Sequence, residues 1–198
     1  MDFIKQQFRR DKILLMYKCG SHAFGTSTDI SDEDYVVVLK DFKGLTHSSN
    51  GKKEYFIFGI DEWKEKQEFS DNYDEYYLIF NDEILAFPNT IIYKDDSMDE
   101  LIEQYKNAFK DNYKKWLKKV VSHYSYYLNL GDVNKNMYHL FRIKFIVDRY
   151  LEKGIFSLEL SDSLKGKIIK FKSLINRSSY EKEITEIVKY LNRLSEVD

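Results

Sequence analysis

Short apolar runs separated by turn residues characterise the first half of the chain. Runs of this length, rich in β-branched and aromatic residues, predict buried strands. The four predicted strands cover residues 12–18, 35–39, 54–60 and 90–93. The polar segment 42–53, with two glycines, two serines and an asparagine, predicts a loop or a hairpin connection. A short helix is expected over residues 61–69, and residues 76–85 fit either a helix or a strand.

Helical spacing of apolar residues replaces this pattern in the second half. Ser97 and Glu100 have the spacing of a capping box, and apolar residues recur behind them as far as Tyr124. The next predicted helix runs over residues 133–153 and is apolar on more than one face, which favours a central bundle position. Two further helices are expected, over residues 164–175 and after a second capping box at Ser178 and Glu181.

These elements predict an α+β fold with a small mixed β-sheet, flanking helices and a C-terminal helical bundle. The change from strand-like to helical pattern near residue 95 predicts two domains, 1–95 and 96–198. No linker rich in Pro, Gly or Ser separates them, so we expect them to pack together with a cleft between them.

Composition narrows the class of protein. The 198 residues are 43% hydrophobic, with 16 Tyr and 14 Phe, which is enough apolar surface for a folded core. A net charge of −2 excludes a global cationic field for nucleic acid. One cysteine excludes an internal disulfide, and one cysteine with four scattered histidines gives no zinc pattern. With no signal-peptide pattern and no membrane-length apolar run, the expectation is a soluble cytoplasmic protein.

Candidate chemistry is concentrated between residues 20 and 38. Asp32 and Asp34 alternate at the head of the Val-rich run, so they share one face about 6.6 Å apart along the strand. Two carboxylates at this spacing repel each other unless a cation lies between them, and oxygen ligands suit Mg²⁺ or Mn²⁺. Gly20 lets the backbone approach a phosphate, and the Ser21 hydroxyl and amide can donate to it. A solvated turn is the ordinary alternative for an isolated Asp-x-Asp.

Two-metal chemistry usually requires a third carboxylate. Glu54 begins the next predicted strand and lies near Asp34 if the two strands are neighbours. Asp61 follows that strand and is the weaker candidate, and Asp29 serves the loop. His22 either touches a phosphate or is a plain loop residue.

The order of Gly20-Ser21, a small-residue loop and Ser31-Asp-Glu-Asp-Tyr35 resembles the nucleotidyltransferase superfamily, which includes polymerase beta. The longer motif, Gly-Ser-His-Ala-Phe-Gly-Thr over residues 20–26 followed by Ser-Asp-Glu-Asp-Tyr over residues 31–35, resembles one branch of the superfamily. This branch consists of predicted bacterial and phage nucleotidyltransferases associated with RNA repair. This resemblance implies that residues 1–95 form the catalytic core. His22 replaces an arginine that is usual in this branch, and Glu54 stands where relatives usually carry aspartate.

A second part of the resemblance is the helical pattern of Lys135, His139 and Arg142. Their spacing places all three on one helix face. The resemblance implies that they line the nucleotide cleft. The alternative is core packing, with His139 and Arg142 satisfied by acidic side chains or carbonyl groups.

The resemblance implies a metal-dependent transfer of a nucleoside monophosphate from an NTP to a hydroxyl, with release of pyrophosphate. Asp32, Asp34 and Glu54 would hold Mg²⁺ or Mn²⁺, and Gly20, Ser21 and His22 would hold the triphosphate. The acceptor is left open among an RNA end, a protein and a small molecule. Two alternatives remain: a nucleotide-binding or partner-docking module without turnover, and an antitoxin-like transferase that modifies a protein.

Overall fold

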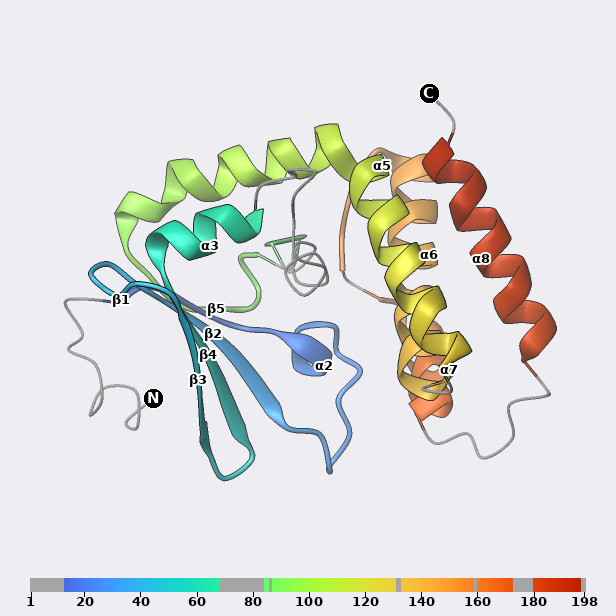
Figure 1. Cartoon of the computed structure of the whole chain (residues 1–198), viewed down its shortest axis with the longest axis horizontal. Coiled ribbons are helices and arrows are strands. Elements are labelled where there is room, and N and C mark those ends of the chain that lie inside the picture. Colours follow the sequence, from blue (N-terminus) through green and yellow to red (C-terminus); the bar gives the residue numbers. More distant parts are fainter. Residues whose placement is uncertain are drawn as a thin grey trace. The chain divides into compact units, whose positions relative to one another are not determined.

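A computed structural model of the chain describes residues 13–67, 84–85, 87–130, 133–158, 160–172 and 180–196. The described residues belong to two compact units (Figure 1). The first contains every strand and the following helix up to Ala108, and the second begins at Phe109. The division therefore falls inside one long helix. The domain limits 1–95 and 96–198 remain a prediction.

A mixed five-stranded sheet forms the centre of the first unit, which confirms the α+β class (Figure 1). Its strand order is β3-β4-β2-β1-β5. The strands are β1 (Ile13–Lys18), β2 (Glu33–Leu39), β3 (Leu45–Asn50), β4 (Lys53–Gly59) and β5 (Ile91–Lys94). β2 and β4 pair in parallel, and the other neighbours are antiparallel. β2 is thus a central strand, and β3 and β5 are the edges.

Helical segments accompany the sheet in the described part of the first unit. They include α2 (Gly20–Ala23), α3 (Ile60–Gln67), the 3₁₀ segment η3 (Asp96–Met98) and the start of α5 (Asp99–Asn129). α3 packs on one face, where the Trp63 indole donates to the Tyr17 hydroxyl at 3.3 Å. The Trp63 ring also meets Tyr105 of α5 at 5.7 Å between centroids, so α5 lies against α3.

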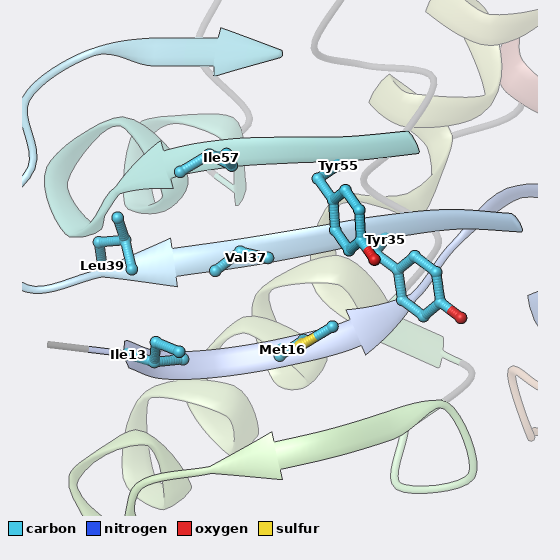
Figure 2. Close-up of a cluster of buried hydrophobic side chains, with 7 residues drawn as sticks. All are labelled: Ile13, Met16, Tyr35, Val37, Leu39, Tyr55 and Ile57. Atoms are coloured by element: carbon cyan, nitrogen blue, oxygen red, sulfur yellow. The ribbon is translucent and has the colours of Figure 1, made fainter. Parts of the chain in front are cut away.

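The opposite face of the sheet carries a second apolar cluster (Figure 2). The Tyr35 and Tyr55 rings stack there with centroids 5.2 Å apart. The cluster consists of Ile13, Met16, Tyr35, Val37, Leu39, Tyr55 and Ile57, all of which are buried. The strands therefore bury side chains on both faces, as expected for strands read from nearly continuous apolar runs.

The second unit is helical. It contains the rest of α5 with α6 (Val133–Lys153), α7 (Asp162–Lys172) and α8 (Glu181–Glu196). α6 contacts both α7 and α8, and it buries residues around much of its circumference, which confirms its predicted central position. Within the described part of the chain, no helix is both long enough and apolar enough to span a bilayer.

Local predictions differ from the structure at two points. Residues 45–50 form a strand, β3, which completes a hairpin with β4, because an edge strand needs neither apolar alternation nor a buried face. Ser97 does not cap α5: its amide and hydroxyl both donate to the Asp95 carboxylate, and α5 begins at Asp99. Ser178 and most of segment 76–85 lie outside the described residues.

The apolar cluster gives a matched test of burial. Ile57 is 1% exposed, whereas Ile30 is 85% exposed. We expect Ile57→Ala to lower the free energy of unfolding of the sheet unit by about 2–5 kcal/mol. Ile30→Ala should change it by less than about 0.5 kcal/mol. Urea unfolding in a Trp116→Phe background checks this, because Trp63 then reports on the sheet unit alone. Equal midpoints for the two variants would contradict the packing described here.

Candidate active site

A close approach between Gly20 and Asp34 defines the candidate site. The Cys19 amide donates to the Asp34 carbonyl at 2.9 Å, which brings the start of α2 beside β2. A β-carbon placed on Gly20 would lie 2.3 Å from the Asp34 Oδ2 atom. Gly20 also has a φ of 60°, in the left-handed region that favours glycine. Two independent observations therefore favour glycine at position 20, and the second of them is the left-handed backbone, whereas the first is the close approach of the backbone to the Asp34 carboxylate.

The loop after α2 is held by its own small polar residues. α2 is only four residues long, and Gly25 follows with a φ of 65°. The buried Thr26 amide donates to the Ser21 carbonyl at 2.9 Å. Further along, the Thr28 amide donates to the Ser31 hydroxyl at 2.9 Å and closes a turn.

The β3–β4 turn supports this loop from the other side. The Lys52 ammonium donates to the Asp29 carbonyl at 2.8 Å. The Glu33 amide donates to the Lys52 carbonyl at 2.7 Å. These two bonds flank the exposed Asp32 and fix the backbone on each side of it. Asp29 thus acts in the loop through its carbonyl group.

Parallel pairing places Glu54 next to Asp34. Glu54 is the direct partner of Asp34 in the β2–β4 register, so the two side chains emerge on the same face of neighbouring strands. The condition for Glu54 to lie near Asp34, that the two strands are neighbours, is therefore met. Asp61 lies in α3, beyond Gly59 and about 16 Å or more along β4 from Glu54. Of the two candidates for a third carboxylate, only Glu54 is near Asp34.

Asp34 and Glu54 form a pair of neighbouring carboxylates, and Asp32 is the third carboxylate of the candidate site. Asp32 shares the face of Asp34 by alternation but precedes β2 and is exposed. Among the described residues, no group of three His, Cys, Asp or Glu side chains is placed to hold a metal ion. Two or three carboxylate oxygens nevertheless suit Mg²⁺, which takes one or two protein carboxylates and completes its shell with water and phosphate. The donor set fits such an ion.

Glu33 faces away from this pair, towards the apolar cluster. It accepts a hydrogen bond from the Tyr35 hydroxyl. That bond lowers the pKa of Glu33, and the nearby charges of Lys53, Lys18 and His22 lower it further. Burial and the hydrogen bond to Glu33 raise the pKa of Tyr35. The His22 Nε2 atom is buried without a hydrogen-bond partner.

His47, on the edge strand β3, lies on the same face of the sheet as Glu54. Its Nε2 atom lies 3.2 Å from Glu54 Oε2. The contact joins β3 to β4, and no spacing in the sequence indicates it because β3 was not predicted as a strand.

Helix α6 carries the predicted cationic residues Lys135, His139 and Arg142, and the structure shows His139 and Arg142 in contact. The Arg142 guanidinium donates to His139 Nδ1 at 3.4 Å, and Arg142 is 2% exposed. The His139 ring stacks on Tyr124, with centroids 4.6 Å apart and an interplanar angle of 7°. An arginine only donates, so Nδ1 accepts and the neutral ring carries its proton on Nε2. The Lys135 side chain lies outside the described residues. The burial of Arg142 agrees with the core-packing alternative, and a role at a nucleotide cleft remains a prediction.

No protein-family model matches the chain, and no curated protein matches its sequence. Among solved structures, the chain is similar to a nucleotidyltransferase-like protein from Exiguobacterium sibiricum 255-15. The TM-score is 0.36 and the identity is 13%, over 98% of this chain and 72% of that chain. The geometry around Gly20 and Asp34 therefore carries the functional proposal.

Gly20 and Gly51 form a matched pair for testing this geometry. Both have a left-handed φ, of 60° and 63°, but a β-carbon on Gly51 would meet nothing within 4 Å. Gly51→Ala should therefore cost only the backbone strain, about 1–2 kcal/mol of unfolding free energy. We expect Gly20→Ala to cost more, because the Asp34 side chain must also move. Urea unfolding followed by Trp63 fluorescence measures both costs.

A double-mutant cycle isolates the contact with Asp34. In an Asp34→Ala background, the cost of Gly20→Ala should fall to that of Gly51→Ala. If Gly20→Ala costs the same in both backgrounds, the close approach between Gly20 and Asp34 is wrong.

The Tyr35–Glu33 hydrogen bond predicts an acid-side pH dependence. Because the folded pKa of Glu33 lies below its usual 4.5, the bond stabilises the fold above this pH and is lost as pH falls through the folded pKa. Tyr35→Phe should lower the free energy of unfolding by roughly 0.5–1 kcal/mol at pH 7, because Glu33 is only partly shielded from water. The difference from the wild type should shrink below about pH 4, which urea unfolding at several pH values would reveal. A constant difference down to pH 3 would contradict the assignment.

Proposed function

We propose that the chain is a metal-dependent nucleotidyltransferase, which moves a nucleoside monophosphate from an NTP to a hydroxyl acceptor. The observation that carries the proposal is the convergence of Gly20, Asp34 and Glu54 at one end of the sheet. A backbone without a side chain approaches one carboxylate, and a second carboxylate stands beside it on the neighbouring strand. A phosphate binds where a backbone without a side chain lets it come close, and a divalent cation binds where carboxylate oxygens lie side by side.

Each part of the site has a distinct task in this proposal. Gly20 and Ser21 hold the triphosphate through backbone amides and the Ser21 hydroxyl, with His22 beside them. Asp34 and Asp32 hold Mg²⁺ or Mn²⁺, and Glu54 completes the set. A bound divalent cation would stabilise charge that develops on the phosphate oxygens. Glu54 accepts the proton of the attacking hydroxyl, and the loop from Gly20 to Ser31 keeps the triphosphate in line.

The proposed acceptor is a hydroxyl group, which belongs to an RNA end, a protein or a small molecule. His139 and Arg142, with Lys135, are proposed to contribute to nucleotide binding. A nucleotide-binding module without turnover is the competing function.

Carboxylate neutralisation tests the proposal. Asp34→Asn and Asp32→Asn keep the size of the side chain but remove its charge. We expect each to weaken Mg²⁺-dependent binding of a non-hydrolysable NTP analogue by on the order of 100-fold, because the cation loses an anionic ligand. Asp61→Asn removes an exposed carboxylate at the far end of β4 and should bind as the wild type does. Isothermal titration with and without Mg²⁺ measures these affinities.

Wild-type affinity in both Asp32→Asn and Asp34→Asn would exclude the proposed site. Turnover is tested separately, by incubating labelled NTP with candidate acceptors and measuring pyrophosphate. Binding that depends on Asp34 without pyrophosphate release from any acceptor would favour the binding module.

A further inference from the structure

The His47 imidazole is held between two residues of β4. Its Nε2 atom is 3.2 Å from Glu54 Oε2, and its ring centroid is 5.0 Å from that of Phe56, at an interplanar angle of 40°. Glu54 and Phe56 are two positions apart on β4, so they share one face of the strand. The ring therefore rests on Phe56 and points a nitrogen at the carboxylate.

The hairpin register makes this contact specific to position 47. His47 is the direct partner of Phe56, and Ser49 is the direct partner of Glu54, so His47 reaches Glu54 along a diagonal. A diagonal neighbour in a sheet is within reach of a long or aromatic side chain but not of a short one. An ionised carboxylate has only acceptor atoms, so His47 Nε2–H donates to Glu54 Oε2.

We propose that His47 is a positioning residue for Glu54, which rests on the proposed function. Glu54 has three rotatable side-chain bonds and is 38% exposed, so it would sample several orientations without a partner. His47 holds Oε2 on the β3 side. The Oε1 atom takes no part in that contact and is the oxygen assigned to the cation and the attacking hydroxyl. Hydrogen bonds that orient metal-binding side chains typically change metal affinity by 10- to 100-fold.

Substitutions at His47 separate the hydrogen bond from ring packing. His47→Phe keeps a ring against Phe56 and removes the donor, whereas His47→Gln keeps an N–H donor of similar reach. We expect His47→Phe to weaken Mn²⁺ binding about 10-fold in the presence of a non-hydrolysable NTP analogue. His47→Gln should recover most of this affinity. Electron paramagnetic resonance of free Mn²⁺ measures binding without requiring an acceptor.

Two controls complete the design. Thr46→Ala changes the neighbouring β3 residue, which faces the opposite side of the sheet beside Ile57, and should bind Mn²⁺ as the wild type does. In a Glu54→Gln background, His47→Phe should cause no further loss, because its effect passes through Glu54. If His47→Phe lowers the melting temperature, His47→Asn replaces it, because the shorter amide cannot reach Glu54 and does not depend on the Phe56 ring.

The outcomes distinguish this proposal from the proposed function. Wild-type Mn²⁺ affinity in His47→Phe and His47→Asn, with weakened affinity in Glu54→Gln, overturns the positioning role and leaves the metal site intact. Equal losses in His47→Gln and His47→Phe also overturn it, since the donor would then be irrelevant. Wild-type affinity in Glu54→Gln and Asp34→Asn as well would reject both the metal site and the role of His47.

Discussion

The parallel register of β2 against β4 is the constraint on which the rest of the site depends. It aligns Asp34 with Glu54 on one face and Tyr35 with Tyr55 on the other. A slip of one residue would turn every side chain of a strand to the opposite face. The buried Tyr35–Tyr55 stack and the apolar residues that follow it oppose such a slip, because it would expose them to water. Core packing on one face thus holds the carboxylates in register on the other.

The backbone of Gly20 and of the loop that follows it forms the second part of the candidate site. Gly20 touches the Asp34 side chain without a side chain of its own, and the loop that joins them closes on itself through Thr26 and Ser31. Lys52, from the β3–β4 turn, ties this loop to the hairpin that carries Glu54 and His47. The loop from Gly20 to Ser31 and the carboxylates are therefore linked through a single hairpin, so a change in its turn would reach both.

The second unit is distinguished by a buried charge. Arg142 is a charged group within an apolar helix bundle, and such a group needs hydrogen-bond partners to remain buried. His139 is one partner, and its own position is set by stacking on Tyr124. The sequence pattern of cations one helical turn apart predicted a shared face, and the described contacts agree with that placement. The same pattern suits a packed interior and a ligand-facing surface, because both require a paired cation.

Local periodicity determined much of this protein from the sequence alone. Apolar runs predicted β1, β2, β4 and β5, helical spacing predicted α6, and alternation placed Asp32 and Asp34 on one face. Three features depended on tertiary structure: the strand character of β3, the position of Glu54 directly beside Asp34, and the contact of His47 with Glu54. An edge strand can be polar throughout, so its pattern carries no signal. The neighbours of Asp34 are set by pairing between distant segments, and only the folded sheet brings Gly20, Glu54 and His47 to one end of it.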